Sequence, residues 1–401
     1  MGHLFASRAL LSRKSFIREI LKVTQSPSII SFAGGLPNPK FFPVDEIKNA
    51  AVKVMETDGA NTLQYTITEG LPSLREWISR RYARRGVDIK PDEILITNGA
   101  QQAVAIIGKT FLEKNDHVVM EKPGYLGAIQ AFEFYETIFN QIDIGEDGID
   151  TAELRKVLDA QDIQLAYLIP NFQNPTGNVY SEAKRRETAE LLKKREILLV
   201  EDEAYYELRF EGKPLPSIRE YYDTNHILLG SFSKIISPGF RVGWCCAKKP
   251  LMEKLVVAKQ ANDLHTSHFT QKVIAQYLAD NDIDRQIQRI IGQYSRQCRC
   301  MLEMIPRYFP PEVQYTKPTG GMFVWATLPE GWSSEELFDV AIAKDVAFVP
   351  GNAFCSDASL GSSMRLNFTN SDEDKIEEGI KRLGSAIKEL FSKKKKTSVI
   401  A

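Results

Sequence analysis

The sequence has no apolar run long enough to cross a membrane and almost no net charge. No hydrophobic stretch reaches the roughly 18 uncharged residues that a membrane-spanning helix needs. The 51 Lys and Arg residues nearly balance the 52 Asp and Glu residues, which leaves a formal net charge of −1. This balance gives no overall attraction to nucleic acid or to anionic lipid, so we expect neither as a partner. The composition, 43% hydrophobic and 26% charged, is that of a globular protein and excludes collagen, a coiled coil and intrinsic disorder.

Cysteine and histidine are also scarce. The five cysteines are odd in number and contain no C-x-x-C spacing, which favours a reducing compartment over a disulfide scaffold. We therefore expect a cytoplasmic protein. The five histidines include one close pair, His265 and His268, with only Asp263 beside it. A metal site needs more ligands nearby, so we expect no metal.

The N-terminal segment has a basic composition. Residues 1–18 contain four Lys or Arg residues and no acid, as in a transit peptide, but no apolar stretch typical of a secretory signal follows. Apolar residues recur at helical spacing over 16–21. We favour an amphipathic helix that belongs to the fold.

Short apolar runs alternate with helical patterns from about residue 90 to 250. Each run is too short for a helix and is rich in Val, Ile and Leu, which is typical of a strand covered on both faces. The expected strands are 94–96, 118–120, 165–169, 197–200 and 227–229, and the helical segments between them include 103–112 and 181–195. This alternation predicts a mainly parallel sheet with helices on both sides.

The C-terminal part has a different pattern, which predicts a small α+β domain. The expected strands are 320–325 and 365–368, and the expected helices are 334–344 and 372–391. A chain of 401 residues also exceeds what one compact core usually holds. We divide it into an N-terminal arm that contributes to the small domain (1–45), a large domain (46–300) and a small domain (301–401).

The loop after the strand at 227–229 combines hydroxyl groups, a lysine and an arginine. Ser231, Ser233, Lys234 and Arg241 occur within it. Two hydroxyls, a guanidinium and free backbone amides suit a phosphate. A lysine beside such a group is partly desolvated, which lowers its pKa and makes its amine nucleophilic towards an aldehyde. Phosphate and aldehyde together indicate pyridoxal 5'-phosphate, although Lys234 taken alone would be a solvated charge.

Two further stretches suit the ring of this cofactor. Three acids, at 201–203, follow the strand at 197–200. They are either a solvated edge or the source of one buried carboxylate that keeps a pyridinium nitrogen protonated. Tyr205 comes soon after them and offers a hydrogen bond to the ring's phenolic oxygen. Asn174, after the strand at 165–169, offers an amide to the same oxygen, and its alternative is an ordinary Asn-Pro turn.

Two weaker signals precede them in the chain. Gly99 lies between a strand and a helix, where glycine lets backbone amides approach a phosphate, although many α/β crossovers have such a glycine. Tyr125 follows another strand and is either a ring that stacks on a flat ligand or a tyrosine of the core or rim.

Together these motifs resemble the fold-type-I pyridoxal-phosphate-dependent aminotransferases of class I/II. Within them the chain is most similar to the branch of α-aminoadipate and kynurenine aminotransferases. The resemblance covers nearly the whole chain from about residue 16. Its most specific parts are Ser-Phe-Ser-Lys-Ile-Ile-Ser-Pro-Gly-Phe-Arg-Val-Gly at 231–243, Asn-Pro-Thr-Gly at 174–177 and Ser-Phe-Ala-Gly-Gly-Leu-Pro-Asn-Pro at 31–39. It implies an α/β fold whose large, cofactor-binding domain (46–300) has a mainly parallel, seven-stranded-type sheet covered by helices. It also implies a small α+β domain (301–401) and an N-terminal arm (1–45) that covers the active site.

The resemblance implies roles at the matching positions. Lys234 is similar to the lysine that bonds to the cofactor's aldehyde and shuttles protons, and Asp202 to the partner of the pyridine nitrogen. Asn174 and Tyr205 are similar to the residues that hold the phenolic oxygen, and Tyr125 to the stacking ring. The implied phosphate site consists of Gly99, Ala100, Gln101, Ser231, Ser233 and Arg241.

Substrate and dimer contacts are implied in the same way. Arg365 is similar to the arginine that grips the substrate α-carboxylate, with Gly35 and Asn174 close to the substrate. Arg18 matches an arginine that meets a side-chain carboxylate, and a solvated helix charge is its alternative. Tyr65 matches a tyrosine that reaches the neighbouring subunit's phosphate, so the resemblance implies a homodimer with an active site shared across the interface.

The implied activity is a transamination in two half-reactions, from an L-amino acid to a 2-oxo acid such as 2-oxoglutarate. The same cofactor motifs serve β-lyases, decarboxylases and racemases, which stay open. Regulators that carry a similar domain behind a DNA-binding module are a remote alternative, because fewer than about 40 residues precede Gly34 and a small domain needs roughly 50. Gln173 and Arg18 favour acidic or long donors such as glutamate and 2-aminoadipate, while aromatic and branched donors stay open.

Overall fold

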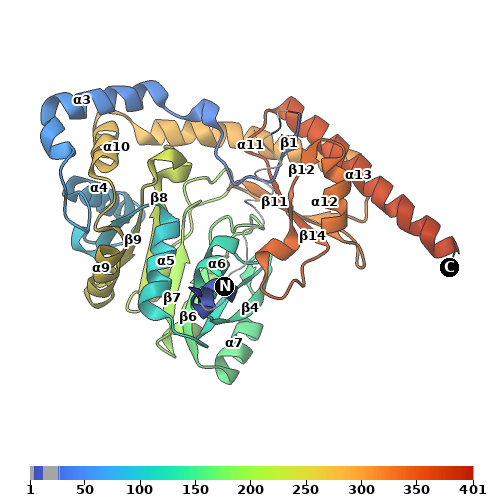
Figure 1. Cartoon of the computed structure of the whole chain (residues 1–401), viewed down its shortest axis with the longest axis horizontal. Coiled ribbons are helices and arrows are strands. Elements are labelled where there is room, and N and C mark those ends of the chain that lie inside the picture. The colour runs from blue at the N-terminus through green and yellow to red at the C-terminus, as the bar shows by residue number, and fades with distance from the viewer. Residues whose placement is uncertain (1–3, 12–25, 27, 401) are drawn as a thin grey trace.

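The computed structural model describes residues 4–11, 26 and 28–400, and it contains one large sheet with helices on both faces (Figure 1). In sheet order, the strands are β2 (Ile94–Thr97), β9 (Gly243–Ala247), β8 (His226–Ser231), β7 (Leu198–Asp202), β6 (Ile163–Leu168), β3 (His117–Lys122), β4 (Ile138–Gly145) and β5 (Gly148–Ile149). The five strands from β8 to β4 run parallel, whereas β9 is antiparallel to both of its neighbours. The predicted mainly parallel sheet is confirmed, with the two-residue β5 as an additional short strand.

The five expected strands of this sheet are present as β2, β3, β6, β7 and β8. Strands β2, β7 and β8 are buried along their whole length, as expected for strands covered on both faces. The sequence patterns missed β4 and β9. Strand β4 is largely unburied and carries polar residues, so it has no continuous apolar run.

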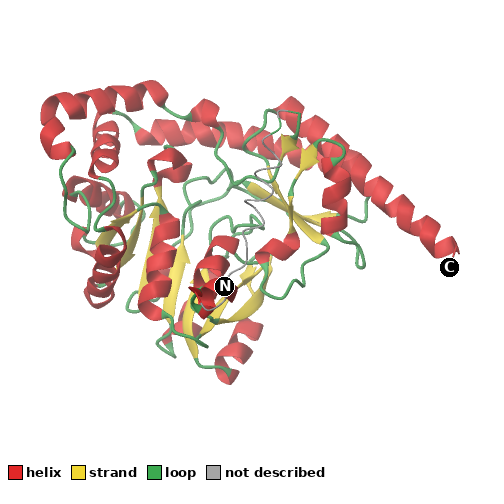
Figure 2. Cartoon of the chain, in the orientation of Figure 1, coloured by secondary structure: helices red, strands yellow, loops and turns green. Residues whose placement is uncertain are grey.

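Helices cover both faces of the large sheet (Figure 2). On one face, α5 (Ala100–Phe111), α6 (Leu126–Glu133) and α9 (Lys249–Asp263) pack on the strands, and on the other α7 (Thr151–Ala160) and α8 (Glu182–Lys193) do so. Asp150 and Ser181 accept hydrogen bonds from backbone amides at the starts of α7 and α8, which fixes where these helices begin. Helices α3 (Val44–Thr62), α4 (Pro72–Ala83) and α10 (His268–Asp280) enclose a further core beside β2 and β9.

A small antiparallel sheet forms the second part of the fold. Its strands, in order, are β10 (Gln314–Tyr315), β11 (Phe323–Thr327), β14 (Ser363–Asn367) and β13 (Val349–Pro350). Strand β1 (Ile30–Ser31) pairs in parallel with β12 (Val346–Ala347), so residues near the N-terminus join this part. Helices α12 (Ser334–Ile342) and α13 (Glu373–Ile400) pack beside the small sheet, as the sequence predicted.

Helix α11 (Ile283–Tyr308) links the two parts of the fold (Figure 1). Ile283 and Ile287 belong to the core beside β2 and β9, whereas Met301 and Ile305 belong to the core of the small part. The predicted boundary at residue 300 therefore falls inside this helix, and the division into 1–45, 46–300 and 301–401 stays a prediction. Helix α1 (Ser7–Leu11) lies in the basic N-terminal segment, and the expected helix over 16–21 lies outside the described residues. None of the helices in the described ranges is long and apolar enough to span a bilayer.

Candidate active site

The carboxyl ends of β6, β7 and β8 meet the start of α5 around a cavity of about 180 Å³. Ligands of open α/β sheets bind at this edge. The predicted site residues that line the cavity are Gly35, Ala100, Gln101, Tyr125, Asn174, Asp202, Tyr205, Ser231, Ser233, Lys234 and Arg241. Gly99 directly precedes Ala100 in the chain, and Arg365 is hydrogen-bonded to Asn174, which lines the cavity. The fold thus brings together most of the residues selected from the sequence.

Lys234 lies in the short 3-10 turn η5 (Phe232–Lys234), which directly follows β8. Its Nζ donates a hydrogen bond to the carbonyl oxygen of Gly35 at 2.9 Å. Burial, together with the nearby cations Arg365 and Arg241, lowers the pKa of Lys234 from 10.5 to about 8. Part of its amine is therefore neutral near neutral pH, and a neutral amine is nucleophilic.

Asp202 ends β7 and is buried at the base of the cavity. Its Oδ2 accepts a hydrogen bond from the Tyr167 hydroxyl at 2.6 Å, and its Oδ1 accepts one from the Ala204 amide at 3.0 Å. Burial raises the pKa of Asp202, and the hydrogen bonds from Tyr167 and Ala204 oppose that shift. These two hydrogen bonds hold the carboxylate in one orientation. Because the carboxylate is buried, its charged form is costly unless a cation binds beside it.

Asn174 connects two other predicted residues. Its Nδ2 donates to the Tyr205 hydroxyl at 3.1 Å, and its Oδ1 accepts from Arg365 Nη1 at 2.9 Å. Arg365 comes from β14, is 2% exposed and also donates to the Ala33 carbonyl at 2.8 Å. Its buried Nε has no hydrogen-bond partner among the described residues, so this guanidinium retains a free donor.

The start of α5 and the loop after β8 form a site suited to an anion. No side chain among the described residues caps the start of α5, where the N-cap residue Gly99 has φ +74°, so the first amides of α5 are free for a ligand. Arg241 Nη2 donates to the Asn98 carbonyl at 3.2 Å, which places the guanidinium over Gly99. The Ser231 hydroxyl accepts from the Ser233 amide at 3.1 Å, so both serines are held in the same turn.

Tyr125 lines the cavity and is fixed by a neighbour from α5. Its hydroxyl donates to Gln101 Oε1 at 2.9 Å, and Gln101 Nε2 donates to the Gly127 carbonyl at 2.7 Å. Burial raises the pKa of Tyr125 to about 12, so the phenol stays neutral. The ring is therefore held in place as a neutral aromatic wall.

Comparisons with known proteins agree with this geometry. The profile of the family Aminotransferase class I and II matches residues 33–383. The chain belongs to this family. It is 41% identical to the aromatic-amino-acid aminotransferase 1 of Thermococcus litoralis, with 97% of this chain and 95% of that protein covered.

Two solved aminotransferases are closely similar. The kynurenine aminotransferase of Pyrococcus horikoshii, in complex with PMP, has a TM-score of 0.92 and 41% identity, over 97% of this chain and 98% of that one. The α-aminoadipate aminotransferase of Thermus thermophilus, complexed with N-(5'-phosphopyridoxyl)-L-leucine, has a TM-score of 0.91 and 40% identity, over 98% and 99%. The predicted resemblance to the aminoadipate and kynurenine branch is thereby confirmed.

Two of the predicted site residues, Tyr65 and Arg18, do not appear among the residues that the structure places at the cavity of this aminotransferase. Tyr65 is 76% exposed and packs edge-on against His265 at 5.8 Å between ring centroids. It lies on the surface of its own chain, as a residue that serves a neighbouring subunit would. Arg18 lies outside the described residues.

The sequence patterns missed two buried residues that are hydrogen-bonded to residues lining the cavity. Tyr167 lies in β6, within an apolar run of the sequence, and only the pairing of β6 with β7 brings its hydroxyl to Asp202. Glu121, at the end of β3, is buried and accepts hydrogen bonds from the Ile169 amide at 2.6 Å and the Tyr180 hydroxyl at 3.0 Å. An acid inside an otherwise apolar strand is a signal that could have identified Glu121.

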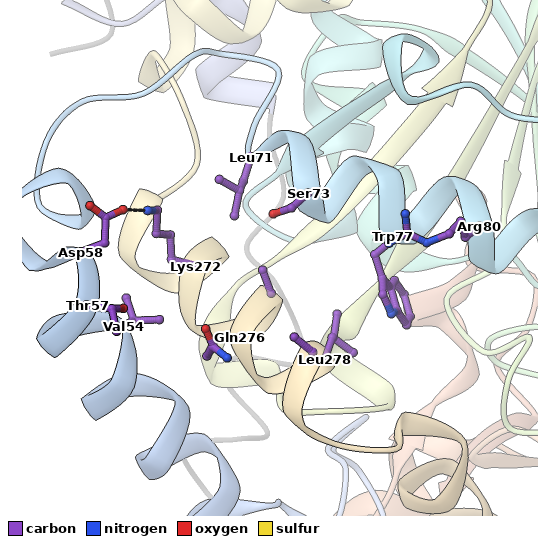
Figure 3. Close-up of a pocket in the computed structure, with 12 residues that line it drawn as sticks. Val54, Thr57, Asp58, Leu71, Ser73, Trp77, Arg80, Lys272, Gln276 and Leu278 are labelled. Atoms are coloured by element: carbon purple, nitrogen blue, oxygen red, sulfur yellow. Dashed lines mark hydrogen bonds and ion pairs between the residues drawn. The ribbon is translucent and has the colours of Figure 1, made fainter.

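A second cavity, of about 450 Å³, lies between α3, α4 and α10 of the aminotransferase (Figure 3). Trp77 and Leu278 give it an apolar wall, and an ion pair between Asp58 and Lys272 closes one side. Its described lining contains none of the residues selected from the sequence. Within the described parts of the chain, no group of three or more His, Cys, Asp or Glu side chains is placed to hold a metal ion.

Proposed function

We propose that this aminotransferase binds pyridoxal 5'-phosphate in the 180 Å³ cavity and moves an amino group from an L-amino acid to 2-oxoglutarate. The observation that carries the proposal is the position of Lys234, whose amine, with its lowered pKa, lines the same cavity as the Asp202 carboxylate and the anion site. When bound, the cofactor supplies an aldehyde that accepts amines and a ring that stabilises negative charge on the neighbouring carbon.

The residues present fit this cofactor at both of its ends. The uncapped start of α5, Ser231, Ser233 and Arg241 supply donors for a phosphate. At the other end, Asp202 is a buried carboxylate whose hydrogen-bond partners among the described residues include no cation, so it suits a protonated ring nitrogen. We assign the phosphate to Gly99, Ala100, Gln101, Ser231, Ser233 and Arg241.

The other roles follow from the same arrangement. Asn174 and Tyr205 face one another and donate to the ring's phenolic oxygen, while Tyr125 stacks on the ring face. Lys234 would hold the cofactor through its Nζ, and its free amine would carry the proton removed from the substrate α-carbon. Catalytic residues in this proposal are thus Lys234, Asp202 and Tyr205.

Arg365 binds the substrate α-carboxylate in this proposal. Its Nη1 donates to Asn174 and its Nη2 donates to the Ala33 carbonyl, and these two partners hold the planar guanidinium in place. The Gly35 carbonyl lies on the same side, within hydrogen-bond distance of Lys234. We propose 2-aminoadipate, aromatic or branched amino acids as donors, with Arg18 meeting a side-chain carboxylate, and the cytoplasm as the location.

We further propose a homodimer. Leu63, Tyr65, Ile67 and Leu264 are large apolar residues that are 71%, 76%, 48% and 55% exposed, and Tyr65 contacts the segment that carries Leu264. A surface with this much exposed apolar area is typical of an interface. Tyr65 would then reach the partner's phosphate.

The test compares the purified protein with Lys234→Ala. The wild type is expected to show the visible absorbance of a lysine-bound cofactor and to release about one equivalent of 2-oxo acid per site when an amino acid is added without an acceptor. Lys234→Ala should lose both signals, and turnover retained in this variant would overturn the assignment. A β-lyase, decarboxylase or racemase would not give this stoichiometry. A panel of amino donors assayed with 2-oxoglutarate then identifies the substrate.

A further inference from the structure

A group of four polar side chains lies directly behind the phosphate site, and none of the roles above uses it. Asn98 and Gln102 flank the turn formed by Gly99, Ala100 and Gln101, whereas Lys259 and Asp263 lie one turn apart at the end of α9. We call Asn98, Gln102, Lys259 and Asp263 the support network. More than 150 residues of sequence separate its two halves, as the contact between Asn98 and Asp263 shows (sequence separation 165).

Asp263 is the centre of the support network. Its Oδ2 accepts hydrogen bonds from Asn98 Nδ2 and from Gln102 Nε2, both at 2.6 Å. Its Oδ1 accepts from Lys259 Nζ at 2.7 Å. One carboxylate therefore holds the residues on both sides of the turn.

Gln102 completes the network from the other side. Its Oε1 accepts from Lys259 Nζ at 2.9 Å and from the Asn98 backbone amide at 2.8 Å. Since its Nε2 faces a carboxylate and its Oε1 faces two donors, only one orientation of this amide satisfies every partner. The backbone of the turn is thus tied to α9 through a set of hydrogen bonds with matched polarity.

The placement of the two charges does not serve the helix itself. Lys259 precedes Asp263 by four residues, the less favourable order for an ion pair within a helix. Asp263 is also the last residue of α9, where the negative end of the helix dipole disfavours a carboxylate. Lys259 is fully buried, so its ammonium needs a partner. The pair therefore does little to stabilise α9, whereas its hydrogen bonds reach Asn98 and Gln102 beside the turn.

The network also reaches the arginine of the phosphate site. The Asn98 carbonyl accepts from Arg241 Nη2 at 3.2 Å, while the side chain of Asn98 is held by Asp263. A shift of Asn98 would therefore move both the free amides of the turn and the guanidinium above it.

We propose that Lys259 and Asp263 are positioning residues for a phosphate monoester, holding the turn at 98–102 so that its amides and Arg241 converge on the phosphate. This inference rests on the proposed function, because the phosphate is that of pyridoxal 5'-phosphate. Neither residue contacts the cofactor ring or the substrate in this proposal. Their effect should therefore be confined to the phosphate.

The experiment measures dissociation constants of the full-length apoprotein for pyridoxal 5'-phosphate and for pyridoxal, which lacks the phosphate, by absorbance titration. The ratio of the two constants is the advantage that the phosphate provides. For Asp263→Asn we expect this ratio to fall about tenfold or more, because hydrogen bonds to a charged group are lost, while the constant for pyridoxal stays unchanged. Inorganic phosphate should also compete less well with the cofactor in this variant.

Two further variants keep the result decisive. Asn98→Ala removes one bond to Asp263 from a half-buried surface turn and should lower the ratio in the same direction, which covers the case that Asp263→Asn does not fold. Glu378→Gln breaks a different pair of residues four apart, with Arg382 on α13, and should leave the ratio unchanged. An equal loss for both ligands, or a ratio that equals that of the wild type, would overturn the inference.

The outcomes separate this inference from the proposed function. A wild-type protein that transaminates while Asp263→Asn keeps its phosphate advantage contradicts the inference alone. A wild-type protein that binds the cofactor tightly through its phosphate, but gives no 2-oxo acid, contradicts the proposed function alone. A wild-type protein that does not bind the cofactor contradicts both.

Discussion

Arg365 donates a hydrogen bond from Nη1 to Oδ1 of Asn174 at 2.9 Å, and this contact joins the small sheet to the cavity of the large one. Both residues are buried, and Asn174 also donates a hydrogen bond to the Tyr205 hydroxyl. The proposed carboxylate site and the proposed ring site are therefore adjacent and share one amide. A change at Asn174 should affect both.

Asn174→Ala should lower kcat/KM for the amino donor by about 10- to 100-fold, because hydrogen bonds to a charged group contribute about 1.5–3 kcal/mol. The variant removes the acceptor of Arg365 and the donor to Tyr205 together. Steady-state kinetics measure the loss. Asn178→Ala is the matched control, since the Asn178 side chain lies in the same loop but donates to the Gly145 carbonyl instead. An equal loss in both variants would contradict the assignment.

Tyr167→Phe should lower kcat by about tenfold, since Asp202 loses a donor and a hydrogen bond to a charged group is worth about 1.5–3 kcal/mol. The bond from Tyr167 lowers the pKa of Asp202, so its removal makes the carboxylate easier to protonate and weaker as a partner of the ring nitrogen. Single-turnover kinetics isolate the affected step. The control is Tyr222→Phe, whose buried hydroxyl donates to the Ile197 carbonyl away from the site, and which should lose stability without losing kcat.

The contrast between Lys234 and Tyr167 shows how far a sequence can predict this site. Lys234 stands in a loop with hydroxyls and an arginine, and such a combination has few structural explanations. Tyr167 stands in an apolar run, where a tyrosine is normally part of the core, and only the register of β6 on β7 reveals its partner. The support network could not be predicted for the same reason, because the placement of α9 against the start of α5 decides it.

The strands also differ in how well the sequence predicts them. Strand β8 is buried throughout and contains the apolar run 227–229, so its sequence alone identifies it. Strand β9 consists of Gly-Trp-Cys-Cys-Ala and has no β-branched residue, and its burial comes from pairing with β2 and β8 on either side. Its position in the sheet therefore depends on tertiary contacts rather than on local propensity.

Glu121 should make the stability of the apoprotein depend on pH. Burial raises the pKa of Glu121 from 4.5 to about 7, and its Oε2 has no partner among the described residues. Between these two values the folded protein holds a proton that the unfolded chain releases, so stability falls as pH rises from about 4.5 to 7 and is then constant. The contribution lost over this window is on the order of 3 kcal/mol.

Glu121→Gln should remove this dependence. Relative to the wild type, the variant should gain stability between pH 5 and pH 8, as measured by the midpoint of urea unfolding at each pH. Glu330→Gln, at an exposed position, serves as a control for the loss of one carboxylate. A difference between wild type and Glu121→Gln that does not change with pH would contradict the raised pKa of Glu121.

Gly99→Ala and Gly86→Ala form a matched pair that separates backbone strain from loss of the phosphate site. Gly99 has φ +74° and Gly86 has φ +80°, so each substitution forces a side chain into a positive-φ conformation at a cost of about 1–3 kcal/mol. A Cβ at Gly86 would meet no atom within 4 Å, whereas a Cβ at Gly99 would lie 2.6 Å from Arg241 Nη2. Because that atom ends a flexible side chain, Arg241 should move aside rather than the fold break.

We therefore expect both variants to lose thermal stability and to differ in cofactor binding. Gly99→Ala should weaken binding of pyridoxal 5'-phosphate by at least about tenfold, the loss expected when a charged hydrogen bond to the phosphate is displaced, while Gly86→Ala binds as the wild type does. Titration of each apoprotein with the cofactor, beside a thermal melt without it, gives both quantities. If Gly99→Ala bound the cofactor as tightly as Gly86→Ala, then Arg241 and the start of α5 would not form the phosphate site, because the added methyl group occupies the space between them.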